Sequence, residues 1–121
     1  MATVLIADDS MFMRKRLSDI LTDEGHDVVA EAEDGNEAIS LYSQLQPELV
    51  MLDITMPERN GMGALNHIMA TAPEARVIMC SALGEETVVQ ECIETGAKAF
   101  VVKPFDPSEV ISAVGDALGG E

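Results

Sequence analysis

At 121 residues the chain is long enough for one domain with a hydrophobic core that needs no disulfide bonds. Seven basic residues against 22 acidic ones give a formal net charge of −15, which argues against direct binding to DNA, RNA or an anionic membrane surface. No apolar run reaches the roughly 20 residues of a membrane span, and strand-like sequence stands in place of a signal peptide. We therefore expect a single cytoplasmic domain over residues 1–121, in which Cys80 and Cys92 stay reduced.

The chain opens with a short apolar run over Thr3–Ala7, which predicts a strand, and continues into an amphipathic helix. Ser10 can cap the start of this helix, and Gly25 follows its end. We also expect Met11 to fill a gap in the core. The apolar residues of the helix recur at spacings of three and four and should face the core: Phe12, Met13, Leu17, Ile20 and Leu21.

A less apolar run over Asp27–Ala32 predicts a second strand at an edge of the sheet. Asp34 can cap the next helix, with Glu37 three residues later as in a capping box, and Pro47 follows that helix. Leu49–Ile54 is the most apolar strand candidate, so we expect it to lie in the centre of the sheet.

The second half of the chain repeats this alternation. A third helix should bury Leu65, Ile68 and Met69, and Asp106 with Pro107 should open the last helix, which ends at Gly119-Gly120. The other expected elements are a loop over Thr55–Gly61, a strand over Arg76–Cys80, a helix over Glu85–Glu94 and a strand over Lys98–Val102. Five strand–helix pairs predict an α/β fold, a doubly wound (βα)5 sheet of five parallel strands with helices on both faces.

Polar residues stand at the ends of these apolar runs. Asp8-Asp9, Asp53, Ser81 and Lys103 each follow one, and in a parallel sheet such residues meet at the carboxyl edge, where ligands bind. If the first and third strands are neighbours, about 4.7–4.9 Å apart, their carboxylates can share one ion. Hard oxygen ligands suit Mg²⁺. The sequence therefore predicts a metal site at Asp8, Asp9 and Asp53.

Asp53 is also the candidate nucleophile, because a carboxylate can accept a phosphoryl group as an acyl phosphate. Lys103 and Ser81 could neutralise and orient that group. Other interpretations exist for each residue: adjacent acids before a helix also favour its dipole, and Lys103 could be an ordinary surface lysine. A phosphatase that starts from a nucleophilic Asp needs a second Asp two residues later, and Thr55 occupies that position.

Five short motifs occur in order along the chain: Asp8-Asp9-Ser10, Leu52–Pro57, Cys80-Ser81-Ala82, Gly96-Ala97 and Lys103-Pro104-Phe105. Together they resemble the receiver domain of two-component response regulators, and the resemblance covers the whole chain. The segments around Asp9 and Asp53 most resemble the stand-alone chemotaxis members of that family. The resemblance implies a flavodoxin-like strand order of 2-1-3-4-5.

The same resemblance assigns roles to individual residues. It implies that Asp8, Asp9, Asp53 and the backbone carbonyl of Thr55 bind Mg²⁺, and that Asp53 is the phospho-acceptor. Lys103 would contact the phosphoryl group, and the bond between Lys103 and Pro104 would be cis. Ser81 and Phe100 would rearrange as the switch; Phe100 lacks the hydroxyl of the tyrosine that many chemotaxis members carry there.

The function implied is that of a phospho-acceptor switch rather than an enzyme. A sensor histidine kinase would phosphorylate Asp53, and the phosphorylated monomer would bind a motility-motor component or an adaptor. A phosphatase would be a further partner. A phosphorelay intermediate, which passes the phosphoryl group to a histidine phosphotransfer protein, would use the same site and is the alternative.

Overall fold

Five parallel strands form one sheet in the order β2-β1-β3-β4-β5, which confirms the order implied by the resemblance. The computed structural model describes residues 1–57 and 60–119. The strands are β1 (Thr3–Ala7), β2 (Asp27–Ala32), β3 (Leu49–Leu52), β4 (Val77–Ser81) and β5 (Ala99–Val102). The helices are α1 (Met11–Asp23), α2 (Gly35–Leu45), α3 (Gly61–Thr71), α4 (Glu86–Thr95) and α5 (Pro107–Ala117). None of the described helices is long and apolar enough to cross a membrane.

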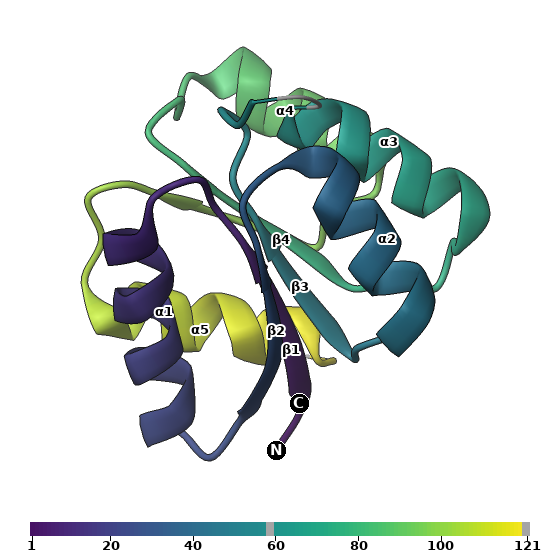
Figure 1. Cartoon of the computed structure of the whole chain (residues 1–121). Helices are drawn as coiled ribbons and strands as arrows, with labels where there is room; N and C mark the ends of the chain where they lie inside the picture. Colours follow the sequence, from purple (N-terminus) through teal and green to yellow (C-terminus); the bar gives the residue numbers. More distant parts are fainter. Residues whose placement is uncertain (58–59, 120–121) are drawn as a thin grey trace.

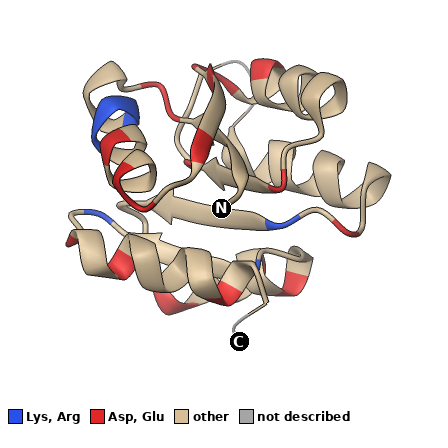
Figure 2. Cartoon of the chain, turned by 90° about the horizontal axis from the view of Figure 1, so that it is seen from below, with Lys and Arg blue, Asp and Glu red and all other residues tan. Residues whose placement is uncertain are grey.

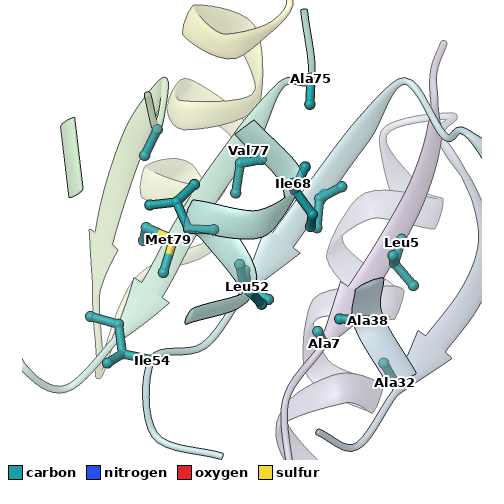
Figure 3. Packing of buried hydrophobic residues seen from close by; sticks show 14 of the residues in the cluster. Leu5, Ala7, Ala32, Ala38, Leu52, Ile54, Ile68, Ala75, Val77 and Met79 are labelled. Atoms are coloured by element: carbon teal, nitrogen blue, oxygen red, sulfur yellow. The ribbon is translucent and has the colours of Figure 1, made fainter. Parts of the chain in front are cut away.

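Helices α1 and α5 cover one face of the sheet, and α2, α3 and α4 cover the other (Figure 1). Successive strand residues point to opposite faces, so each inner strand must be apolar on both sides. Leu5 and Leu52 accordingly pack beneath α2 and α3, together with Ile68 of α3 (Figure 3). Ile6 and Met51 pack against the α1 and α5 side. The strand order places β3 in the centre of the sheet, and its burial on both faces agrees with that position.

Side chains accept backbone N–H groups at the start of α1, α2 and α3. The Ser10 hydroxyl accepts the Met13 N–H at 3.2 Å, and the Asp34 carboxylate accepts the Glu37 N–H at 2.8 Å. Glu37 returns its carboxylate to the N–H of Glu33 rather than to that of Asp34, so only half of the expected capping box forms. The Asn60 side chain caps α3 by accepting the Gly63 N–H at 3.0 Å, which the sequence pattern did not predict.

Four strand boundaries differ from those expected: β3 ends before Ile54, β4 begins after Arg76 and extends past Cys80, and β5 begins after Lys98. β3 ends at Leu52 rather than Ile54, because the Ile54 carbonyl accepts the Gly61 N–H at 2.7 Å and is therefore committed to the turn before α3. β4 extends to Ser81, which pairs with Val102 and so lies in the strand rather than after it. Residues 58–59 of the expected loop, and Gly120 at the expected end of the last helix, lie outside the described residues.

The expected inward face of α1 is partly wrong. Leu17 and Leu21 are buried, but Met11 and Phe12 are 74% and 76% exposed. At 3.6 residues per turn, Phe12 lies about 140° around the helix from Leu17, so the two cannot share one stripe. Arg14 falls on the stripe instead, three residues before Leu17 and seven before Leu21, and it is buried.

Candidate functional site

The carboxylates of Asp8 and Asp53 lie side by side because β1 and β3 are neighbours in register. Ala7 pairs with Leu52, so the next residue of each strand emerges at the same edge, where the Asp53 N–H donates to the Ala7 carbonyl at 2.9 Å. Both Asp8 and Asp53 are buried, whereas Asp9 is exposed. Carboxylate oxygens of all three residues lie within 4.8 Å of one another.

This donor set fits Mg²⁺. Mg²⁺ is a hard ion that takes oxygen ligands, few of them protein carboxylates and the rest water or phosphate. Two buried carboxylates supply fixed oxygens, and the exposed Asp9 leaves a side open for such further ligands. Three like charges this close repel one another, which a divalent cation would relieve.

Lys103 brings a positive charge from the other side of the site. It follows β5, and its backbone N–H donates to the Ser81 carbonyl at 2.9 Å. Its ammonium donates to the Asp8 carboxylate at 2.7 Å and lies 3.4 Å from the Asp53 carboxylate. The peptide bond between Lys103 and Pro104 is cis. Residues 95 positions apart in sequence, Asp8 and Lys103, thus form one ion pair.

Burial and charge shift the protonation of these groups. Burial raises the pKa of Asp53, and the negative charge of Asp8 raises it further, against the opposing effects of Lys103 and of a backbone hydrogen bond from Thr55. Burial alone would lower the pKa of Lys103, but its hydrogen bond to Asp8 and the charge of Asp53 raise it. Lys103 is therefore a fixed cation, and Asp53 is a carboxylate whose charge the site only partly compensates.

The remaining predicted residues surround this centre. Ser81 is buried at the end of β4, and its hydroxyl accepts the Leu83 N–H at 3.1 Å. Thr55 is exposed in the chain segment after Asp53. Phe100 is half-buried on β5 and packs against the core on the α2 and α3 side.

Two further residues that sequence reasoning missed support the site. A Cβ at Gly61 would overlap the Asp53 backbone carbonyl, so only glycine permits this close approach. Arg14 donates to the Asp8 backbone carbonyl at 2.6 Å. An Arg on an otherwise apolar stripe, three residues before Leu17, was the signal available in the sequence.

Comparisons with known proteins agree with this geometry. The model of the response regulator receiver domain matches residues 4–115. Chemotaxis protein CheY of Thermotoga maritima is 50% identical over 111 residues, which are 92% of either chain. CheY of Listeria monocytogenes is 50% identical over 114 residues, covering 94% of this chain and 96% of the relative.

A solved structure shows the same fold. The CheX–CheY–BeF3–Mg²⁺ complex from Borrelia burgdorferi matches with a TM-score of 0.92 and 45% identity, over 93% of this chain and 86% of that chain. A five-stranded parallel sheet with acidic residues at the ends of β1 and β3 and a lysine after β5 defines a class of two-component signalling proteins. The chain belongs to the response regulator receiver domain family, and it is closely related to CheY chemotaxis proteins.

Proposed function

We propose that this chain is a phospho-acceptor switch: Asp53 takes a phosphoryl group from a sensor histidine kinase in a Mg²⁺-dependent reaction. The observation that carries the proposal is the meeting of Asp53 with Lys103, 3.4 Å away, and with the carboxylates of Asp8 and Asp9. A carboxylate nucleophile, a cation for the incoming oxygens and a cluster of metal ligands are the parts that acyl-phosphate formation needs.

In the transfer step, a carboxylate oxygen of Asp53 attacks phosphorus and the P–N bond of the donor phosphohistidine breaks. The electron pair of that bond passes to the imidazole nitrogen, which takes up a proton. Lys103 offsets negative charge on the phosphoryl oxygens, and because its position is fixed by Asp8 it needs no rearrangement first. A bound Mg²⁺, held by Asp8, Asp9, Asp53 and the Thr55 carbonyl, would neutralise further charge on the phosphoryl oxygens.

The switch that follows would begin at Ser81. Its hydroxyl oxygen accepts the Leu83 N–H, and its O–H could donate to a phosphoryl oxygen on Asp53, which would draw Ser81 toward that group. Movement of Ser81 would free the segment before α4, and Phe100 would repack toward the vacated space. The face formed by α4, β5 and α5 would then change its affinity for a partner, which is a population shift between two states.

The output that we propose is control of a motility motor, through a motor-switch component or an adaptor, with a phosphatase to end the signal. The support is the close relation to chemotaxis proteins named CheY in Thermotoga maritima and Listeria monocytogenes. The chain then acts as a signalling switch and not as an enzyme that turns over an external substrate.

Intact-mass measurement after incubation with acetyl phosphate tests the proposal. Wild type with Mg²⁺ should gain one phosphoryl mass, while an EDTA sample and an Asp53→Asn variant should not. Ser81→Ala should still accept the group, but beryllofluoride should then shift the amide signals of α4 less than in wild type. Equal labelling of Asp53→Asn or of the EDTA sample would refute the proposed reaction.

A further inference from the structure

Four polar or charged residues are buried among the described residues: Asp8, Arg14, Asp53 and Ser81. Three of them have a part in the chemistry proposed above. Arg14 is the fourth, at 7% exposure, and its hydrogen bonds and ion pairs go to Asp8, Glu31 and Glu33 rather than to Asp53 or Lys103. A buried guanidinium is unfavourable unless its N–H groups form hydrogen bonds or ion pairs, so the partners of Arg14 indicate what it does there.

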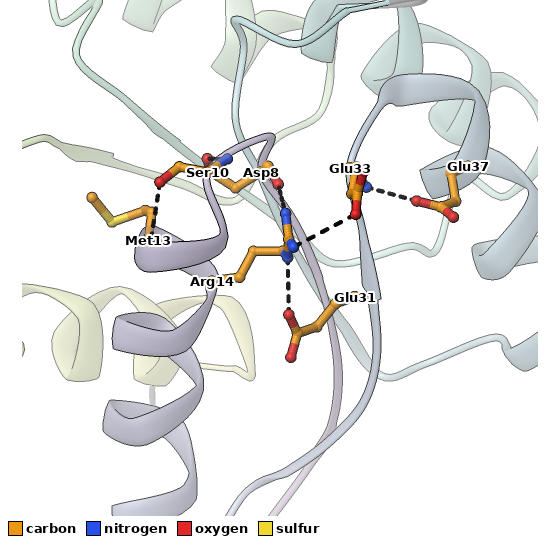
Figure 4. A network of polar contacts seen from close by, with 7 residues as sticks. All are labelled: Asp8, Ser10, Met13, Arg14, Glu31, Glu33 and Glu37. Atoms are coloured by element: carbon orange, nitrogen blue, oxygen red, sulfur yellow. Dashed lines mark hydrogen bonds and ion pairs between the residues drawn. The ribbon is translucent and has the colours of Figure 1, made fainter.

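Arg14 spans the gap between α1 and β2 and holds the loop that carries the acidic residues (Figure 4). One guanidinium nitrogen donates to the backbone carbonyl of Asp8 at 2.6 Å. The Nε donates to Glu31 at 2.9 Å, and the remaining nitrogen lies 3.8 Å from Glu33. Both glutamates are on or just after β2, so Arg14 links the Asp8 carbonyl to the neighbouring strand.

The Asp8 carbonyl belongs to the peptide unit that also contains the Cα of Asp9. Because a peptide unit is planar, holding its carbonyl oxygen from one side restricts where the Asp9 Cα can lie. The other bonds of Asp8 act on different atoms: its N–H donates to Ala32, and its carboxylate accepts from Ser10 and Lys103. Arg14 is therefore the side chain that holds the Asp8 carbonyl itself, while the bond from the Ser10 N–H restrains the chain on the other side of Asp9.

Charge neutralisation cannot be the main effect of Arg14 on the acidic cluster. Its positive charge is already paired with Glu31 and faces Glu33, so the three side chains together carry a net negative charge. The contact with the site is through a backbone carbonyl, which constrains geometry rather than charge.

We propose that Arg14 is a positioning residue for the cation site, which orients the Asp8–Asp9 peptide unit so that the Asp9 carboxylate faces those of Asp8 and Asp53. The inference rests on the proposed function, because it concerns the affinity of that same site for Mg²⁺. Removing a residue that orients a metal ligand without touching the metal weakens binding by about 10- to 100-fold.

Calorimetric titration with Mg²⁺ tests this. Arg14→Met should weaken Mg²⁺ binding by about 10- to 100-fold. Arg14→Lys should weaken it by a smaller factor, because an ammonium has no planar fork to span Asp8 and Glu31 together. Glu31→Gln, which removes the charge of the partner of the Arg14 Nε, should also weaken Mg²⁺ binding by a smaller factor than Arg14→Met. Lys15→Met removes an equal charge from the exposed side of α1 and should leave the affinity unchanged.

A second measurement separates positioning from general damage. At saturating Mg²⁺ the maximal rate of labelling by acetyl phosphate should return to the wild-type value in Arg14→Lys, since Asp53 and Lys103 are untouched. A wild-type Mg²⁺ affinity in folded Arg14→Met overturns the inference. If that variant does not fold, unchanged affinity in both Arg14→Lys and Glu31→Gln overturns it. A wild-type protein that neither binds Mg²⁺ nor accepts a phosphoryl group refutes the proposed function instead.

Discussion

The buried position of Asp53 disfavours the ionised form of its carboxyl group. Burial and the neighbouring Asp8 outweigh the attraction of Lys103, so the folded-state pKa of Asp53 lies above its ordinary 3.8. The native state therefore binds the Asp53 proton more tightly than the unfolded chain does. By linkage, this group lowers the free energy of unfolding as pH rises from 3.8 through the folded-state pKa.

We therefore expect Asp53→Asn to be more stable than wild type at neutral pH in EDTA. Asparagine is uncharged at every pH, so the advantage should shrink as pH falls through the folded-state pKa and vanish well below 3.8, where wild-type Asp53 is protonated in both states. Mg²⁺ should also reduce it, because the ion stabilises the wild type by mass action. Urea unfolding at neutral and acidic pH measures the difference, and an Asp53→Asn variant no more stable than wild type at neutral pH would contradict it.

Gly61 and Gly115 offer a matched pair at the residue scale. A Cβ at Gly61 would overlap the backbone carbonyl of Asp53, so Gly61→Ala should destabilise the fold by about 1–3 kcal/mol. A Cβ at Gly115, within α5, meets no atom within 4 Å, so Gly115→Ala should stabilise by about 0.5–1 kcal/mol. Urea midpoints for both variants test the contrast, and a Gly61→Ala variant no less stable than wild type would show that the overlap at Gly61 is relieved by small backbone movement.

Single residues differ in how well sequence can place them. Asp8, Asp9 and Asp53 could be brought together in advance, because each follows an apolar run and parallel strands end at a common edge. Arg14 could not, because its partners Glu31 and Glu33 lie on another element and no spacing rule connects them. The exposed position of Phe12 was also missed, since several apolar residues in α1 compete for one stripe.

At the scale of elements, α1 has one buried stripe and one exposed apolar side, and these should respond differently to truncation. Leu17→Ala removes a fully enclosed side chain and should cost about 2–5 kcal/mol of unfolding free energy. Phe12→Ala removes a larger side chain that is 76% exposed, and should change stability by no more than about 0.5 kcal/mol. Urea unfolding compares the two; a larger loss in Phe12→Ala than in Leu17→Ala would mean that the buried stripe has been misassigned.

The element pattern was predictable because each strand is a short, mostly apolar run, each helix is amphipathic, and several helices begin with a capping residue such as Ser10 or Asp34. The spatial order of the strands is not contained in those runs; it came from the resemblance to a known family, and the structure bears it out. Boundaries moved where tertiary hydrogen bonds decide them. The Ile54 carbonyl binds Gly61 and so ends β3 early, and Ser81 pairs with Val102 and so extends β4.

The whole molecule carries its charges unevenly. Three of the seven basic residues are consecutive in α1, which Figure 2 shows as its most prominent blue segment. No Lys or Arg occurs from Val77 to Ala97, a range that includes all of α4. Glu86 and Glu91 are exposed on that helix, on the sheet face opposite α1. A net charge of −15 can be explained by solubility alone. The gathering of acidic residues on α4, without a Lys or Arg, also suits a partner with basic residues.

We expect that reversing both charges, with Glu86→Lys and Glu91→Lys, will slow association of the phosphorylated protein with a motor-switch component. Electrostatic steering acts mainly on the association rate, so the rate should fall by about tenfold at low salt, and the difference should shrink as salt screens the charges. Labelling of Asp53 should be unaffected, since neither glutamate contacts the site. Stopped-flow or surface-plasmon kinetics at two salt concentrations measure both effects.

The matched control is Asp23→Lys with Glu24→Lys, which changes the net charge equally at the exposed end of α1, on the other face of the sheet. If the acidic α4 surface steers the partner, the control should associate at close to the wild-type rate. Equal slowing in both variants would show that only total charge matters, and unchanged kinetics in the α4 variant would leave those glutamates a role in solubility alone. The contrast between the two variants, more than either rate, decides whether α4 is a docking surface.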